Sequence, residues 1–257
     1  PGEAKNSNLA TLETLNCDYQ LIDTEDKRAE IIQKLLTSKI LSLDTETTGT
    51  EPMDAELVGM SFSIAENEAF YVPVPTDQEE ALKIVNEFRP VFENENSLKV
   101  GQNIKYDMIV LQNYGVQVKG PLFDTMIAHY VLQPELRHGM DYLAEIYLRY
   151  QTIHIDELIG PKGKNQKNMR DLAPKDVYRY ACEDADVTLK LKNVLEKELK
   201  ENDAERLFYD IEMPLVPVLV NIERNGVLLD TEALKQSSAH FTAQMENIEK
   251  EIYELAG

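Results

Sequence analysis

The sequence lacks long apolar runs, and this absence excludes a membrane-spanning helix. Every apolar run is well under the ~20 residues that a helix needs to cross a bilayer. The first eight residues are polar and lack the apolar core of a secretory signal. We therefore expect a cytoplasmic protein with no membrane partner.

Cysteine is scarce as well. Only Cys17 and Cys182 occur, far apart in the chain, so we expect no disulfide framework and a reducing compartment. The sequence also lacks the Cys and His spacing of a zinc site, the Gly-x-x-x-x-Gly-Lys phosphate loop and the Gly-x-Ser-x-Gly elbow of serine hydrolases. These absences exclude three familiar classes of functional site.

Positive charge is in short supply, because 26 basic residues face 46 acidic ones and the net charge is −20. Nucleic-acid binders usually present a basic face, so the average charge argues against that class. Carboxylates that hold cations are neutralised by them, however. The segment 160–170 also departs from the average, because it contains Lys162, Lys164, Lys167 and Arg170 and no acid. It is either a solvated loop or a phosphate-contacting loop beside a site.

The most informative stretch is Asp44-Thr45-Glu46, which ends an apolar run that begins at Ile40. Side chains alternate along a strand, so Asp44 and Glu46 share a face. Two close carboxylates repel each other unless a cation lies between them, and Mg²⁺ prefers such oxygen ligands. The following residues, 47–49, end the strand near a loop, where chemistry is often found. Alone, the pair is equally compatible with a solvated strand end.

The pattern along the chain predicts an α/β fold, a mixed sheet flanked by helices. The expected strands are 19–22, 40–46, 57–64, 69–74 and 98–100. The expected helices are 24–36, 76–92, 103–114, 124–132, 141–150 and 174–200. We expect Thr24, Asn103, Asp124 and Asp141 to cap helix N-termini, and Pro174 to open the last helix of this set.

Three regions are expected along the chain. Residues 1–17 are predicted to be a linker or disordered, and 18–201 to form the sheet domain. Residues 202–257 contain two further helical patterns, 207–224 and 231–255, and are too few for an independent core. We interpret them as a helical extension, the truncated start of a further domain.

Two more segments add carboxylates. Asp107 lies four residues after Asn103, and Asp184 lies four residues after Tyr180, so each pair shares a helical face. Asp186 points elsewhere and is not counted as a ligand. Four acids from three segments are then expected to converge on one pocket: Asp44, Glu46, Asp107 and Asp184. The free-energy cost of burying four like charges together would be prohibitive without cations. Two divalent ions ~4 Å apart would neutralise them and form the clamp used for in-line phosphoryl chemistry.

The ordered trio Asp44-x-Glu46, Asn103-x-x-x-Asp107 and Tyr180-x-x-x-Asp184 resembles the 3′–5′ exonucleases with a ribonuclease H-like fold, in their tyrosine subtype. Segments 100–107, 163–166 and 180–188 further resemble the proofreading domain of bacterial family A DNA polymerases, the DNA polymerase I family. Segments 211–219 and 222–227 resemble the entry to the polymerase thumb of the same family. The resemblance covers the chain from Asp18 to its end.

This resemblance implies a metal-dependent nuclease that removes nucleotides from a single-stranded DNA 3′ end as 5′-monophosphates, for proofreading in replication and repair. It implies two divalent ions, Mg²⁺ or with Mn²⁺ or Zn²⁺ in one site. Asp44 would bridge both ions, Glu46 and Asp184 would complete the tighter site, and Asp107 would hold the second ion. Tyr180 and Glu46 would position the attacking water.

The resemblance also implies a substrate site and partners. The residues expected to contact the 3′-terminal nucleotide, or to support the ligands, are Thr47, Gln102, Asn103 and Tyr106. Thr50 and Ile155 depart from the family pattern, in which a leucine and an aromatic side chain pack on the terminal bases. The implied partners are the DNA 3′ end and the polymerase domain of the same chain, and the protein is expected to be a monomer. The polymerase active site is not expected within these residues.

Two alternatives remain open. One is a related exoribonuclease that acts on RNA 3′ ends, against which the polymerase-like segment 211–227 argues. The other is a catalytically silent domain that only supports a neighbouring polymerase, against which the presence of all four acids and Tyr180 argues.

Overall fold

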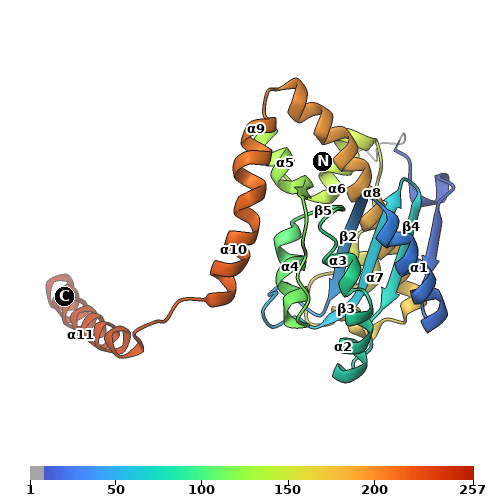
Figure 1. Cartoon of the computed structure of the whole chain (residues 1–257). Coiled ribbons are helices and arrows are strands. Elements are labelled where there is room, and N and C mark those ends of the chain that lie inside the picture. Colours follow the sequence, from blue (N-terminus) through green and yellow to red (C-terminus); the bar gives the residue numbers. More distant parts are fainter. Residues whose placement is uncertain (1–8) are drawn as a thin grey trace. The chain divides into compact units, whose positions relative to one another are not determined.

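The chain divides into two compact units, Pro1–Asn221 and Ile222–Gly257, and the computed structural model describes residues 9–257. The first unit contains a six-stranded sheet with the strand order β1-β4-β3-β2-β5-β6 (Figure 1). The strands are β1 (Asp18–Leu21), β2 (Ile40–Thr47), β3 (Leu57–Ala65), β4 (Glu68–Pro73), β5 (Leu98–Gly101) and β6 (Leu122–Asp124). β3 is antiparallel to β2 and β4 and the other pairs are parallel, which confirms the mixed sheet expected from the sequence.

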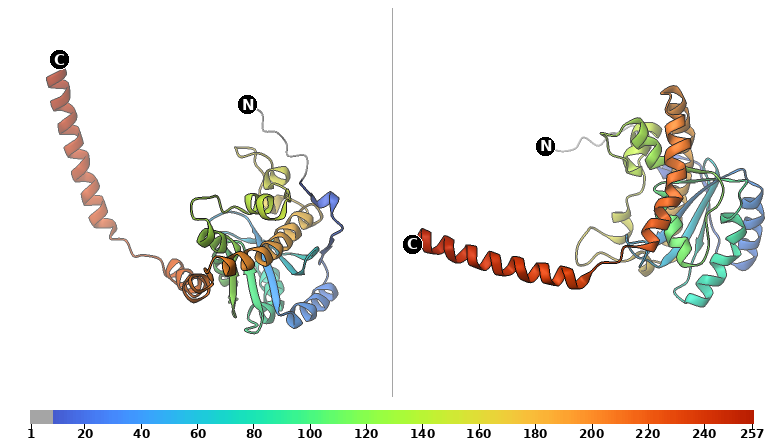
Figure 2. Two further views of the ribbon diagram at one scale, coloured as in Figure 1. Left: turned by 90° about the horizontal axis from the view of Figure 1, so that it is seen from above. Right: turned by 60° about the vertical axis from the view of Figure 1, so that its left-hand side comes forward.

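Side-chain alternation divides the central strand β2 between the two faces of the sheet. Leu41 and Leu43 are buried in the main core. This core also takes apolar residues from α1 (Glu25–Thr37), α2 (Gln78–Glu87), α3 (Arg89–Phe92) and α4 (Ile104–Asn113). The opposite face carries Asp44 and Glu46, and the long helix α8 (Pro174–Glu201) crosses it (Figure 2). The acidic pair thus faces a helix rather than open solvent.

Small residues allow α8 to approach this face closely. On β3, the residues opposite Ser42, Asp44 and Glu46 are Ser63, Ser61 and Gly59. On α8, Ala181 and Ala185 are fully buried, as their small size predicts. A Cβ atom on Gly59 would lie 2.3 Å from the hydroxyl oxygen of Tyr71. The Tyr71 ring packs with Ala181 in a second apolar cluster, so a side chain at position 59 has no room.

The start of α4 differs from the prediction. Asn103 occupies the N-cap position, but its backbone is left-handed, with a φ of 62°, and its side chain makes no capping hydrogen bond. Asp124 caps the helix instead, because its Oδ2 accepts a hydrogen bond of 2.7 Å from the Ile104 amide. Its Oδ1 accepts a 3.0 Å bond from the Ile127 amide and caps α5 (Thr125–Leu132), as predicted. One buried carboxylate therefore serves two helix N-termini.

We predict a large stability loss for Asp124→Ala. The variant leaves one buried and one partly buried amide group without an acceptor, so the free energy of unfolding should fall by about 2–4 kcal/mol. Asp124→Asn keeps one acceptor oxygen and should lose less. Urea denaturation followed by circular dichroism measures both variants. Equal stability of Asp124→Ala and the wild type would contradict the shared cap.

Two other helices depart from their predicted bounds or caps. The segment 76–92 forms α2 and the separate short helix α3, because Pro90 in the first turn of α3 lacks an amide hydrogen. The helix predicted from Asp141 begins earlier, as α6 (Met140–Leu143), and continues as the π-helical turn η2 (Ala144–Leu148). Asp141 does not cap it, since its Oδ1 accepts a 2.8 Å hydrogen bond from the Thr152 hydroxyl. Thr24 caps α1 as predicted.

The sequence predicts a linker or disordered segment over residues 1–17, but the part of this segment that the structure describes forms local structure. Residues 1–8 of that segment lie outside the described part. Ala10 forms a parallel bridge with Tyr150, and the buried Leu12 begins the short helix η1 (Leu12–Thr14). Residues before the predicted domain start at residue 18 therefore already pair with and pack on the sheet domain.

The first unit also extends past residue 201, where the sequence places its end. After α9 (Glu205–Leu207) and η4 (Phe208–Glu212), α10 (Met213–Asn225) continues through Pro217. Phe208, Val216 and Val220 belong to the main core. In the second unit, α11 (Thr231–Ala256) is exposed along its length. Within residues 9–257, no helix has both the length and the apolar character that crossing a membrane requires.

Candidate metal centre and active site

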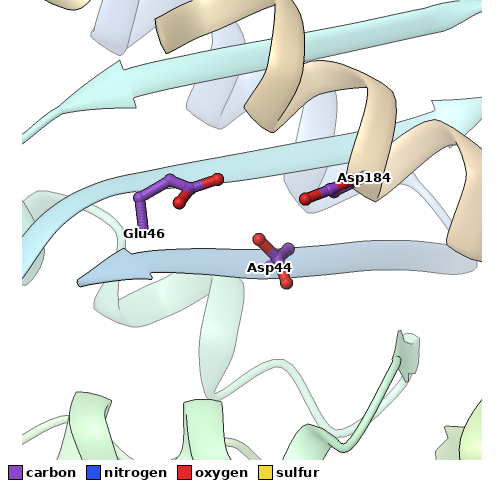
Figure 3. A group of neighbouring side chains, drawn as sticks. All are labelled: Asp44, Glu46 and Asp184. Carbon is purple, nitrogen blue, oxygen red and sulfur yellow. The ribbon is translucent and has the colours of Figure 1, made fainter. Parts of the chain in front are cut away.

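Three carboxylates meet where α8 crosses the end of β2. Asp44 and Glu46 lie on one face of the strand, and Asp184 comes from the helix above it (Figure 3). One oxygen of each lies within 4.8 Å of the others. The strand alternation and the helical position of Asp184 therefore bring together three of the four acids that the sequence predicts.

Burial makes this arrangement unfavourable for three free anions. It raises the pKa of Asp44 to about 6. Burial and the neighbouring carboxylates raise the pKa values of Glu46 and Asp184 well above their ordinary range. In addition, Glu46 Oε1 is buried and has no hydrogen-bond partner among residues 9–257. An unpaired buried carboxylate oxygen beside two others suits a hard divalent cation, which prefers oxygen ligands. The residues present fit a metal site.

Asp107, the fourth predicted ligand, lies in the first turn of α4 and is buried. Its Oδ1 accepts a 2.6 Å hydrogen bond from the Thr45 hydroxyl, and it is not part of the three-carboxylate group. Burial, and after it the charge of Asp44, raises the pKa of Asp107 well above its ordinary value. The carboxylate is therefore electrostatically coupled to the group, and its role as a ligand stays a prediction.

Tyr180 lies on α8 four residues before Asp184, and its ring is half-buried. Burial raises the pKa of Tyr180, and the charges of Asp184, Glu46 and Asp44 raise it further, so its hydroxyl stays protonated. Asp186 points away from the group, as expected from the sequence. It accepts hydrogen bonds of 2.7 Å from the Tyr19 hydroxyl and 2.8 Å from the Asn67 amide.

The predicted substrate residues fall into two groups. The hydroxyl oxygens of Thr47 and Tyr106 lie 2.6 Å apart, and both contact the Gly49 carbonyl. Gln102 is held by internal contacts, because its Nε2 donates a 2.7 Å bond to the His138 carbonyl and its Oε1 accepts from Thr125. Thr47, Gln102 and Tyr106 are partly exposed, and Asn103, whose backbone is left-handed, is exposed.

One polar contact was missed from the sequence. His129 and His138 carry no pairing pattern, yet their Nδ1 atoms lie 2.7 Å apart. Burial, together with His138, lowers the pKa of His129 to about 4. Since the His138 carbonyl also accepts from Gln102, this pair holds the segment after α5 against the start of α4. A spacing of nine residues across a loop follows no helical or strand period, so the sequence offers no signal for it.

Solved structures share this fold. The POL domain of Pol1 from M. smegmatis, in complex with DNA primer-template and dNTP, matches with a TM-score of 0.71 at 18% identity, over 89% of this chain and 36% of that one. Brucella melitensis NrnC with bound Mg²⁺ matches with a TM-score of 0.63 at 18% identity, over 82% of this chain and 95% of that one. The mixed sheet flanked by helices therefore places this domain in the ribonuclease H-like fold class, with three carboxylates where α8 crosses the sheet.

Sequence comparison identifies the family. A family model described as 3′–5′ exonuclease matches residues 19–200. DNA polymerase I of Pseudomonas aeruginosa is 38% identical over 250 residues, 93% of this chain and 27% of that protein. DNA polymerase I of Borreliella burgdorferi is 34% identical over 252 residues, 97% of this chain and 27% of that protein. The chain belongs to the 3′–5′ exonuclease domain family of DNA polymerase I, and it spans about a quarter of the length of these relatives.

Proposed function

We propose that this domain is a metal-dependent exonuclease that hydrolyses the terminal phosphodiester of single-stranded DNA from the 3′ end and releases 5′-monophosphates. The observation that carries the proposal is the close group of the half-buried Asp44 and the buried Glu46 and Asp184, with an unpaired oxygen on Glu46. Such a group is stable as anions only with cations, and the family membership supplies the reaction class. Its role would be proofreading within a DNA polymerase I chain, as a monomer in the cytoplasm.

Each residue then has a defined task. Asp44, Glu46 and Asp184 would hold one cation, and Asp44 and Asp107 a second. Two such ions supply a nucleophile at neutral pH and stabilise the charge that develops on the phosphoryl oxygens. The protonated Tyr180 hydroxyl lies beside these carboxylates and would orient the attacking water together with Glu46. The two hydroxyl groups of Thr47 and Tyr106, with Asn103, would bind the terminal nucleotide, and Gln102 would support the start of α4.

We also propose the domain limits. The exonuclease domain would cover residues 18–201, and residues 202–257 would be the helical start of the polymerase domain, although the first compact unit continues to Asn221. The last residues of the core, such as Val220, lie on α10, so this helix would join the two parts.

The direct test is digestion of a 5′-labelled single-stranded DNA decamer with Mg²⁺ or Mn²⁺. We expect a ladder that shortens from the 3′ end and the release of 5′-mononucleotides, both abolished by EDTA. An RNA decamer of the same sequence, digested in parallel, distinguishes the exoribonuclease alternative, for which RNA would be the faster substrate. Absence of digestion with either ion would show that the domain is catalytically silent and would overturn the proposal.

A further inference from the structure

A cluster of lysines stands out in this acidic chain. The segment 160–167 connects α7 (Ile155–Ile159) to η3 (Met169–Asp171) and contains no acid. Its lysines, Lys162, Lys164 and Lys167, are all exposed. We call this segment the lysine loop. A local excess of positive charge on a molecule of net charge −20 marks a surface that attracts anions.

Internal hydrogen bonds define the shape of the lysine loop. The Lys167 amide donates a 2.8 Å bond to the Ile159 carbonyl, which closes the base of the loop. Within it, the Gln166 amide donates to the Gly163 carbonyl at 3.1 Å, and Gln166 Nε2 donates to the Gly160 carbonyl at 3.1 Å. Gly160 has a φ of +84°, which other residues rarely adopt. The backbone that carries the three ammonium groups is therefore folded onto itself.

Both ends of the lysine loop pack beside the acidic site. Ile159 and Met169 belong to the second apolar cluster, which also contains Ala181 and Tyr180 of α8. This is the stretch of α8 that leads directly to Asp184. The lysine loop therefore lies next to the turn of α8 that carries Tyr180, the proposed catalytic tyrosine, and Asp184, one proposed metal ligand.

The C-terminal side of the loop is also attached to the end of β2. Asn168 Nδ2 donates a 2.6 Å bond to the carbonyl of Thr48, the neighbour of the predicted substrate residue Thr47. Arg170 donates bonds of 2.6 Å to the carbonyls of Val74 and Leu57. Arg170 thus holds the backbone in place, and the three lysines are the cations that this segment presents to solvent.

We propose that Lys162, Lys164 and Lys167 bind phosphates of the DNA single strand upstream of the scissile bond. The inference rests on the proposed function and extends it to the substrate beyond its terminal nucleotide. A polyanion that approaches Asp44, Glu46 and Asp184 meets a domain of its own sign, so cations beside the site lower the electrostatic cost of binding. Because lysine contacts phosphate as a point charge, this binding would be independent of sequence and sensitive to salt.

The test compares the wild type with the triple variant Lys162→Ser, Lys164→Ser, Lys167→Ser on two substrates. On a DNA decamer, the slope of log KM against log salt concentration should fall by about 2, since each phosphate contact on a single strand contributes about 0.7. Raising the salt from about 50 to about 200 mM should then raise the wild-type KM roughly 16-fold more than that of the variant. The kcat should stay within about twofold, because the lysines do not touch the reacting atoms.

A dinucleotide serves as the second substrate, because its only phosphodiester is the scissile one. We expect equal kinetics for the two proteins on it. A matched control replaces Lys83, Lys197 and Lys200 by serine, which removes the same charge from exposed positions on α2 and α8. Lys197 and Lys200 lie about 20 Å or more along α8 from Asp184. The control should keep most of the wild-type salt slope.

Two results would overturn the inference. One is an unchanged salt slope in the lysine-loop variant, and the other is a loss of equal size in the control variant. A wild-type protein that digests neither the decamer nor the dinucleotide would instead contradict the proposed function itself. The two failures are therefore distinguishable.

Discussion

Asp184→Asn is expected to lower the kcat of DNA cleavage by at least about 100-fold, since even residues that only support metal ligands cost 10–100-fold when replaced. The asparagine keeps the shape of the side chain but loses the charge that binds the cation. The same change should stabilise the protein in EDTA, because it removes one of three closely spaced carboxylates that repel one another. Single-turnover cleavage and urea denaturation measure the two effects.

Asp186→Asn is the matched control, two residues further along α8. Asp186 is fully buried and forms an ion pair with Lys190 at 2.7 Å, away from the three-carboxylate group. The substitution leaves the partly buried ammonium group of Lys190 without its counter-charge, so we expect a loss of stability with cleavage retained. The two variants should therefore behave in opposite ways. Wild-type cleavage by Asp184→Asn would remove that residue from the proposed metal site.

The second large effect concerns pH and metal together. Without metal, the protein should become less stable as the pH rises from about 5 to about 8. The pKa of Asp44 is about 6 in the folded state, against an ordinary value of 3.8, and those of Glu46, Asp107 and Asp184 are raised well above their ordinary values. In this window the folded state binds more protons than the unfolded state, so the free energy of unfolding falls as the pH rises.

For Asp44 alone, the loss is about 3 kcal/mol between about pH 4 and about pH 7, and about half of it falls above pH 5. The other three carboxylates extend the window to higher pH. His129 acts in the opposite direction, because its pKa is lowered to about 4 and the unfolded state gains the proton first as the pH falls below about 6.5. The effect of this one imidazole is outweighed by that of the four carboxylates, so the free energy of unfolding falls as the pH rises.

Mg²⁺ should reverse this dependence. The cation binds the ionised carboxylates of the folded state, so it should add about 2.7 kcal/mol at a concentration 100 times its Kd. The gain should appear at pH 8 and largely vanish at pH 5, where protons compete for the same oxygens. Urea denaturation in EDTA and in Mg²⁺ at both pH values measures it, and Asp184→Asn should reduce both effects. Stability in EDTA that rises with pH and does not respond to Mg²⁺ would contradict the metal site.

The parts of the site that were predictable from the sequence depend on local geometry. Alternation along a strand places Asp44 and Glu46 on one face, and helical spacing places Tyr180 near Asp184. The structure confirms both placements. The meeting of the strand and the helix could be expected only because the motifs resembled a known family, since no local period relates β2 to α8.

The features that escaped prediction depend on residues far apart in the chain. Asn103 is of a residue type that often caps helices, but the Ile104 amide donates its hydrogen bond to Asp124 of the neighbouring strand instead. The contact between His129 and His138 depends on how a loop returns to α5. The end of the first unit depends on Phe208, whose ring packs at a centroid distance of 4.8 Å on that of Phe123 in β6. None of these contacts can be inferred from the charge pattern or from helical periodicity alone.

The absence of a side chain at Gly59 has a consequence for how such domains lose activity. A methyl group there would collide with Tyr71, and Tyr71 belongs to the same apolar cluster as Ala181, on the helix that carries Asp184. A single carbon at this position could displace the helix and separate the ligands while every acid remained in the sequence. The presence of all the acidic residues is therefore not enough to distinguish active nucleases from inactive relatives. The glycine that packs beneath the helix should be checked as well.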